Sequence, residues 1–358
     1  MRALVLWADD RSSNLGVRAL GEGAHALLQQ AWPEVQVEFQ SFGRGPAPLP
    51  IQGARSLVRE RITGRFGLQK WLSGFDVVLD MRAGDSFTDA YGAARLTTMS
   101  TLAECATQAG TPVVLGPQTI GPFSTARGRA IGRWSLRRAR LVMARDSVSA
   151  AHAVELGRAV DALSTDVVFA LPVPQTPRTR DVLLNISGLL WQPGPHVDAE
   201  RYRSTVADLY RSLTAGGRRV DLMAHVLPSS SPDDDVPAID EFRSTIAPDA
   251  QALIPGSLTE ARELVASAEL VIGSRMHACL NALSVGTPAI PLAYSRKFAP
   301  LLDDLGWHHT VDLRVDTDAA TSALRLTDRD DLDDGAASVR DRAQVLLRPA
   351  VEALRGLG

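Results

Sequence analysis

Residues 273–277, with the sequence Gly-Ser-Arg-Met-His, carry the side chains of this 358-residue chain that are best suited to bind an anion. An apolar run at residues 270–272 predicts a buried strand just before them, and a helical pattern follows them. Ser274 is a favourable N-cap residue, so we expect the helix to begin there. The first turn of the predicted helix then holds both Arg275 and His277.

The chemistry of this segment follows from its place at the start of a helix. Backbone N–H groups of a first turn have no partner within the helix, and the helix dipole makes this end positive. Arg275 adds a planar pair of donors, and His277 can donate a hydrogen bond or a proton near neutral pH. The segment therefore predicts a phosphate or carboxylate site, because an anion would offset the local positive charge. The alternative is that Arg275 caps a neighbouring loop and that His277 is a core histidine with satisfied hydrogen bonds.

The first half of the chain alternates short apolar runs with longer helical patterns, which predicts βαβ units and a parallel sheet. The predicted strands are residues 3–7, 35–39, 77–80, 113–115, 141–144 and 167–169. The predicted helices are residues 18–30, 97–109, 126–138 and 147–156. Residues 171–180 then contain three prolines, which interrupt both helix and strand, so this segment is predicted to be a linker.

The second half repeats the alternation. Its predicted strands are residues 182–186, 219–224, 270–272 and 289–292, and its predicted helices are residues 199–215, 276–285 and 339–354. We therefore expect an α/β protein with two doubly wound, Rossmann-like domains that face a cleft, as in glycosyltransferase-B folds. The predicted domains are residues 1–172 and 181–345, with 346–358 as the end of the C-terminal helix. Ligands of such sheets bind outside the carboxyl ends of the strands, so the site should face the cleft.

Composition and short motifs exclude several classes of protein. A net charge of −3 predicts no broad electropositive surface for nucleic acid. The two cysteines, Cys105 and Cys279, exclude a disulfide framework and suit a reducing cytoplasm. No apolar run reaches 18 residues, so no transmembrane segment is predicted. The acidic run 233–235 is interpreted as a solvated loop, and the pair 308–309 (His-His) lacks a spaced third ligand, so no metal site is predicted.

Motifs across most of residues 1 to about 305 resemble the polysaccharide pyruvyl transferase family. In the second half these are the strand–Gly-Ser-Arg-Met-His-Ala–helix–Gly-Thr-Pro pattern at 270–288, followed by Tyr294 and Lys297. The first half contributes Asn-Leu-Gly at 14–16, Met-Arg-Ala-Gly-Asp-Ser-Phe-Thr-Asp-Ala-Tyr-Gly at 81–92, Gly-Pro-Gln-Thr-Ile-Gly-Pro-Phe at 116–123 and Ala-Arg-Asp-Ser-Val-Ser at 144–149. One departure is the first loop, where Val17 and Arg18 follow the glycine and the family usually has an acidic residue.

The resemblance implies a two-domain transferase that moves the pyruvyl group of phosphoenolpyruvate to sugar hydroxyls, commonly as a cyclic ketal. Phosphoenolpyruvate is then the donor substrate, and no cofactor or metal is expected. Its phosphate and carboxylate require donors on two sides. The residues expected to bind it are Arg275, Ser274, Tyr294 and Lys297 with the helix N-terminus, and Arg145 from the opposite domain. The alternatives for Arg145 are a salt bridge to the adjacent Asp146 or a surface position.

The same resemblance suggests roles for the remaining candidates. His277 would protonate the enol methylene or assist phosphate departure, and Asp85 would be the base on the sugar side. The alternative for Asp85 is a turn-forming role. Asn14, Tyr91 and Gln118 could bind sugar hydroxyls.

The expected partner is a saccharide acceptor that can be lipid- or nucleotide-linked and belongs to a cell-envelope or exported glycan. The enzyme is expected in the cytoplasm, with the inner membrane face as a further place of work. Two competing functions stay open: a nucleotide-sugar glycosyltransferase or epimerase of the same fold, and a non-catalytic anion- or sugar-binding relative.

Overall fold

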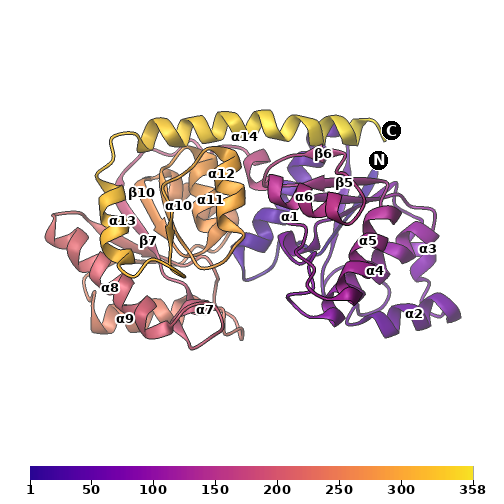
Figure 1. Cartoon of the computed structure of the whole chain (residues 1–358), viewed down its shortest axis with the longest axis horizontal. Coiled ribbons are helices and arrows are strands. Elements are labelled where there is room, and N and C mark those ends of the chain that lie inside the picture. The colour runs from indigo at the N-terminus through magenta and orange to yellow at the C-terminus, as the bar shows by residue number, and fades with distance from the viewer. Residues whose placement is uncertain (358) are drawn as a thin grey trace. The chain divides into compact units, whose positions relative to one another are not determined.

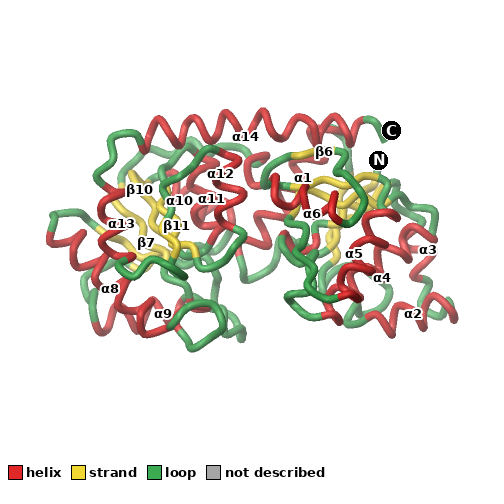
Figure 2. The backbone as a smooth tube through the Cα atoms, viewed as in Figure 1, coloured by secondary structure: helices red, strands yellow, loops and turns green. Residues whose placement is uncertain are grey.

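The computed structural model describes residues 1–357, which divide into two compact units (Figure 1). The first unit comprises Met1–Arg11, Leu20–Leu171 and the C-terminal residues from Gln344. The second comprises Ser12–Ala19 and Pro172–Ala343. Each unit contains one six-stranded parallel sheet with helices around it (Figure 2).

The sheet of the first unit has the strand order β2-β1-β3-β4-β5-β6. Its strands are β1 (Arg2–Leu6), β2 (Gln36–Gln40), β3 (Val77–Asp80), β4 (Val113–Gln118), β5 (Leu141–Ala144) and β6 (Ala162–Leu163). The α-helices are α1 (Leu15–Ala31), α2 (Ala54–Thr63), α3 (Leu68–Leu72), α4 (Ala93–Gln108), α5 (Ala126–Arg138) and α6 (Ser147–Glu155). The 3-10 helices are η1 (Arg82–Gly84) and η2 (Val167–Ala170). Strands β3 and β4 are buried along their whole length, because helices cover both faces of such a sheet.

The sheet of the second unit has the order β12-β11-β10-β7-β8-β9. Its strands are β7 (Arg180–Asn185), β8 (Val220–Met223), β9 (Ala252–Leu253), β10 (Ala268–Gly273), β11 (Ala289–Ala293) and β12 (Val311–Asp312). Its helices are α7 (Gly188–Trp191), α8 (Ala199–Ala215), α9 (Val236–Thr245), α10 (Leu258–Ala266), α11 (Met276–Val285), α12 (Phe298–Leu305) and α13 (Ala319–Thr327). Helix α14 (Leu332–Arg355) begins in this unit and ends in the first.

In the second unit the chain builds the sheet from β7 toward β9 on one side and then crosses to β10 on the other side of β7. This is the doubly wound order in which ligands bind where the strand order reverses. The carboxyl ends of β7 and β10 are therefore the expected binding edge. The predicted α/β fold of the glycosyltransferase-B type, with two doubly wound sheets, is confirmed.

The predicted strand at residues 167–169 is wrong. This apolar run forms η2 instead, since the Asp166 carboxylate accepts a hydrogen bond from the backbone N–H of Val168 at 3.0 Å and starts a tight turn. The strand that pairs with β5 is β6, a few residues earlier. Burial of valine and phenylalanine occurs in either conformation, so apolar composition alone did not distinguish them.

Candidate active site

The turn between β10 and α11 lies at the point of the second unit where the strand order reverses. Asn185, the last residue of β7, holds this turn: its side-chain oxygen accepts the backbone N–H of Arg275 at 3.0 Å. Its amide group donates to the Met223 carbonyl at the end of β8, at 2.9 Å. One asparagine thus ties the carboxyl ends of three strands together.

The prediction that Ser274 is the N-cap of α11 is wrong. Arg275 occupies that position, and its side chain makes no capping hydrogen bond. The Ser274 hydroxyl instead lies 2.8 Å from the Tyr202 hydroxyl, which accepts the Ser187 N–H at 2.9 Å. Burial raises the pKa of Tyr202 to about 12, so the phenol stays protonated. Ser274 is fully buried, and a buried hydroxyl takes the nearest partner available.

Arg275 forms a buried ion pair with Asp235. Its Nε and Nη2 lie 3.1 and 2.7 Å from the same carboxylate oxygen, and Nη2 also donates to the Asp233 carbonyl. Burial lowers the pKa of Arg275, but the charge and hydrogen bond of Asp235, together with the charges of Tyr294 and Asp233, raise it above its usual value. The guanidinium therefore remains charged and is held in one orientation.

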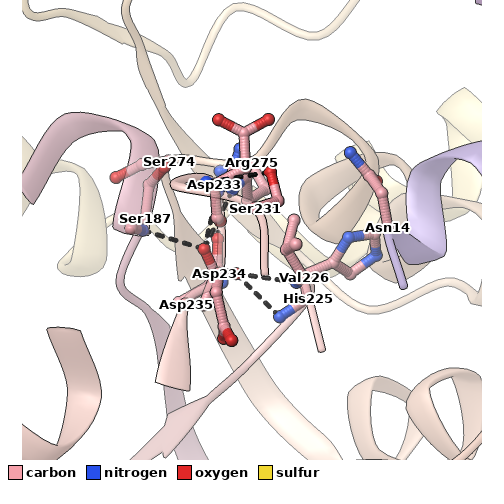
Figure 3. Close-up of polar contacts among 12 residues, drawn as sticks. Asn14, Ser187, His225, Val226, Ser231, Asp233, Asp234, Asp235, Ser274 and Arg275 are labelled. Atoms are coloured by element: carbon pink, nitrogen blue, oxygen red, sulfur yellow. Dashed lines mark hydrogen bonds and ion pairs between the residues drawn. The ribbon is translucent and has the colours of Figure 1, made fainter. Parts of the chain in front are cut away.

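Asp235 is 0% exposed, which corrects the interpretation of residues 233–235 as a solvated loop. Its carboxylate accepts the N–H groups of Gly188, His225 and Val226 at 2.8, 2.9 and 2.8 Å in addition to Arg275 (Figure 3). Gly188 permits this approach, since a Cβ there would lie 1.9 Å from the Asp234 carbonyl oxygen. Asp235 could not be identified from the sequence, because its hydrogen-bond partners come from three separate segments of the chain.

His277 is half-buried in the first turn of α11, whereas the other residues of that helix are buried. Gly16 lies against its ring: a Cβ at position 16 would be 3.0 Å from Nδ1 of His277 and 3.0 Å from the Asn14 side-chain oxygen. The Asn14 segment belongs to the second unit and is held by a bridge to Val226 and by the bond from the Leu15 N–H to the His225 carbonyl at 3.0 Å. The structure thus brings together Asn14 and His277, two of the predicted site residues.

A buried hydrogen-bond chain leads from Arg262 to the backbone of His277. Arg262 can only donate, and its Nη1 lies 2.9 Å from Oδ1 of Asn281. The Asn281 amide nitrogen therefore faces Nε2 of His225 at 3.2 Å and the His277 carbonyl at 2.7 Å. Nε2 of His225 therefore accepts a hydrogen bond from the Asn281 amide, and the proton of the neutral imidazole is on Nδ1.

His225 is a neutral histidine beside the site. Burial, followed by the charges of His277 and Arg275, holds its pKa well below the usual value of 6.5. Sequence reasoning missed both His225 and Asn281. The position of His225 just after the predicted strand 219–224, at the carboxyl edge of a sheet, was the available signal.

Tyr294 lies close enough to Arg275 to affect its pKa, and Lys297 and Arg275 both affect the pKa of His196. The buried Tyr294 ring packs edge-on against His196 with centroids 5.2 Å apart. Burial lowers the pKa of His196, and the charges of Lys297 and Arg275 lower it further against the opposing charge of Asp233. Lys297 is the N-cap residue of α12. This side of the turn is therefore positively charged.

In the first unit, the structure joins Asp85 and Tyr91: the Tyr91 hydroxyl donates to the Asp85 carboxylate at 2.8 Å. Asp85 follows η1, where Arg82 and Ala83 have left-handed φ angles of 45° and 50°. The buried ion pair of Arg82 with Asp80, at 2.8 Å, supports that strained backbone. The Asp85 side chain is thus placed by a strained turn and a hydrogen bond; Asp85 itself is half-buried, and Tyr91 is half exposed.

Arg145 is 1% exposed, so the alternative of a surface position is wrong. Its salt bridge is to Asp166 at 2.9 Å, not to the adjacent Asp146, which caps α6 by accepting the Ser149 N–H. Nη2 of Arg145 is buried without a hydrogen-bond partner in residues 1–357. The side-chain amide of the fully buried Gln118 donates to the Asp80 carbonyl at 3.4 Å. Its side-chain oxygen, like Nη2 of Arg145, has no hydrogen-bond partner among residues 1–357.

No group of three or more histidine, cysteine, aspartate or glutamate side chains among residues 1–357 could hold a metal ion. Within the same residues, no helix has the length and apolar character needed to cross a membrane.

Solved structures with this fold include a UDP-GlcNAc 2-epimerase, MurG and HepE. UDP-GlcNAc 2-epimerase from Neisseria meningitidis, solved with UDP-GlcNAc, aligns with a TM-score of 0.61 at 11% identity, over 98% of this chain and 100% of the epimerase. MurG from Acinetobacter baumannii aligns with a TM-score of 0.55 at 14% identity, over 99% of each chain. HepE from Anabaena, solved with UDP, aligns with a TM-score of 0.56 at 11% identity, over 99% and 98%. At these identities the likeness establishes the fold alone.

The family comparison is more specific. The model of the polysaccharide pyruvyl transferase family matches residues 14–296, a span that runs from the Asn14 loop to the residue before Lys297 and contains Arg275 and His277. The chain belongs to the polysaccharide pyruvyl transferase family, and it is a transferase.

Proposed function

We propose that this chain transfers the pyruvyl group of phosphoenolpyruvate to hydroxyls of a glycan or glycan precursor and forms a pyruvate ketal. The main support is the arrangement at the start of α11, where His277 lies beside the charged Arg275 and under the Asn14–Gly16 loop. Family membership supports the reaction class. The arrangement offers an anion-binding end of a helix next to a group that can move a proton.

The donor is proposed to bind at this end of α11. The phosphate and the carboxylate of phosphoenolpyruvate take hydrogen bonds from the first turn of the helix and from Arg275, with Lys297 and Tyr294 close by and Ser274 supporting the turn. Asp235 already accepts from two nitrogens of Arg275, so its part is to orient the guanidinium. Arg145 is proposed as a further donor to phosphoenolpyruvate through Nη2, the nitrogen that neither Asp166 nor Thr119 engages.

The proposed reaction consumes two acceptor hydroxyls and releases phosphate. His277 delivers a proton to the methylene carbon while the first hydroxyl oxygen bonds to the central carbon. The second hydroxyl oxygen then bonds to the same carbon as the bond to the phosphate oxygen breaks, which closes the ketal. One hydroxyl proton ends in the new methyl group and the other leaves with the phosphate, so atoms and charge balance.

The acceptor is proposed to contact Asp85 as the base, with Tyr91, Gln118 and Asn14 as hydrogen-bonding residues. The Tyr91 hydroxyl donates to Asp85 and so orients the carboxylate. A saccharide that is lipid- or nucleotide-linked, from a cell-envelope glycan, is the proposed acceptor class. The proposed place of work is the cytoplasm and the inner membrane face. No cofactor is proposed.

The test is acceptor-dependent release of phosphate from phosphoenolpyruvate, together with a pyruvyl mass gain on the acceptor. A panel of lipid- and nucleotide-linked saccharides serves as acceptors. His277→Gln is expected to abolish turnover and keep the melting temperature, while the matched control His308→Gln, at an exposed histidine, keeps full activity. Retained turnover in His277→Gln would refute its role as the proton donor.

The competing function on the same fold is a nucleotide-sugar glycosyltransferase or epimerase. Thermal-shift measurements with phosphoenolpyruvate, UDP and GDP separate it from the proposal. Stabilisation by phosphoenolpyruvate alone supports pyruvyl transfer. Stabilisation by a nucleotide diphosphate, with no phosphate released from phosphoenolpyruvate, overturns it.

A further inference from the structure

Helices α2, α4 and α5 of the first unit share an outer face that exposes apolar side chains. Helix α4 packs against both of the others and lies between them (Figure 1). On α2 and the turn after it, Val58, Ile62 and Phe66 are 50%, 80% and 52% exposed, and Trp134 of α5 is 39% exposed. Val58 and Ile62 are one turn apart and therefore lie on the same side of α2.

The two segments that carry these apolar side chains are rich in arginine. Residues 54–70 contain five cationic residues and one acidic residue, and residues 126–140 contain six arginines and no acidic residue. The two segments together have a formal charge of +10, whereas the whole chain has −3, so the rest of the chain has −13. The near-neutral charge of the whole chain therefore coexists with a strongly positive charge in these two segments.

The acidic residues near this face leave most of its charge uncompensated. Glu60 is buried, and its carboxylate accepts the N–H groups of Phe66 and Leu68 at 3.0 and 3.2 Å. Glu104 of α4 pairs with Arg138 at 2.9 Å and engages that one arginine. Most of the other arginines of the two segments are exposed.

Between α2 and α4 the face is hollowed by a groove of about 450 Å³. It is lined by Arg55, Val58, Arg59 and Ile62 from α2 and by Thr97 and Thr101 from α4. The cationic and the apolar side chains of α2 therefore line the same groove and lie on one side of the helix.

We propose that the outer face of α2, α4 and α5 docks on an anionic membrane surface. Arginines pair with lipid phosphates while Val58, Ile62, Phe66 and Trp134 enter the interfacial region, as in helices that lie on a bilayer. Nucleic acid would satisfy the arginines but would leave the aliphatic Ile62 in water. A second copy of the chain in a symmetric dimer would oppose two faces of like charge. The inference does not depend on the donor chemistry proposed above.

The test is co-sedimentation of the full-length chain with vesicles of phosphatidylglycerol and phosphatidylcholine, compared with vesicles of phosphatidylcholine alone. We expect binding to the anionic vesicles that weakens as salt is raised. Removing one arginine from a membrane contact lowers partitioning about five-fold, so Arg55→Glu/Arg59→Glu, at the two arginines that line the groove, should lower it by about 25-fold or more. Ile62→Glu should also weaken binding.

The matched controls lie on α14, where Arg342→Glu/Arg348→Glu makes the same charge change and Val345→Glu replaces another exposed apolar residue. Circular dichroism and melting temperature establish that each variant is folded, and phosphate release with a water-soluble acceptor should be unchanged. The proposal is overturned by any of three results: equal binding to both vesicle types, equal losses in the α14 controls, or no vesicle binding together with self-association or DNA binding through this face.

Discussion

Replacing Asp235 with asparagine tests whether this buried carboxylate holds the candidate site together. The substitution keeps the size of the side chain and removes its charge. It leaves Arg275 buried beside a neutral amide. It also replaces one carboxylate oxygen, which accepts hydrogen bonds, by an NH2 group that faces the N–H donors around it. We expect Asp235→Asn to destabilise the protein by about 3–5 kcal/mol, the range for removing one partner of a buried ion pair.

The geometry sets the upper limit of this effect. At the closest approach of 2.7 Å, between Nη2 of Arg275 and Oδ1 of Asp235, two unit charges attract by about 6 kcal/mol at an effective dielectric constant of about 20. The asparagine oxygen still accepts some of the hydrogen bonds, which lowers the loss. The expected loss is a large part of a typical unfolding free energy of about 5–15 kcal/mol.

The assay is urea denaturation followed by circular dichroism, with transition midpoint and slope compared among variants. Asp208→Asn is the control, since Asp208 pairs with Arg211 at an exposed site and should change stability by less than about 0.5 kcal/mol. In Asp235→Asn/Arg275→Met the uncompensated charge is gone, so the double variant should be more stable than Asp235→Asn alone. A loss below about 1 kcal/mol in Asp235→Asn, or strict additivity in the double variant, would refute the role assigned to the ion pair.

Three further outcomes are expected. The unfolded chain protonates His225 near pH 6.5, whereas the folded chain does not. As the pH is lowered from 6.5, the unfolding free energy should therefore decrease more steeply in wild type than in His225→Gln, by up to about 1.4 kcal/mol per pH unit. Parallel curves of stability against pH would contradict this. Gly188→Ala should lower the unfolding free energy from urea denaturation by about 3 kcal/mol, because the new Cβ meets the Asp234 carbonyl. Gly194→Ala is the control and should be nearly neutral, since the nearest atom to its new Cβ is 3.8 Å away. Similar effects at both positions would argue against the close contact. Tyr202→Phe removes the hydroxyl that serves Ser187 and Ser274 and should cost about 1–3 kcal/mol, and a neutral result would mean that water replaces it.

Much of the local structure was predictable from the sequence. The predicted strands 77–80 and 141–144 and the predicted helices 126–138 and 199–215 match β3, β5, α5 and α8 residue for residue. The end of α11 was also predicted, since Gly286 adopts a left-handed φ of 85° and closes the helix through its own N–H. These features depend on neighbours within one or two turns, and the order of residues along the chain specifies those neighbours.

The placement of the candidate site was predictable to the same extent. A strand followed by Arg275 and His277 at a helix start must lie at the carboxyl edge of a parallel sheet, because strand direction is shared within that sheet. What the sequence alone determined is therefore most of the strands, several helices, the fold class and the sheet edge on which the candidate donor site lies.

Only the tertiary structure decided which groups neutralise and orient those side chains. Asp235 was interpreted as solvated and is the buried partner of Arg275, while Asn14, from the start of the chain, lies against the Gly16 backbone over His277. Arg145 pairs with Asp166 instead of its neighbour. A charge pairs with whatever the fold brings within a few ångströms of it, and that distance is set by packing between segments far apart in the sequence.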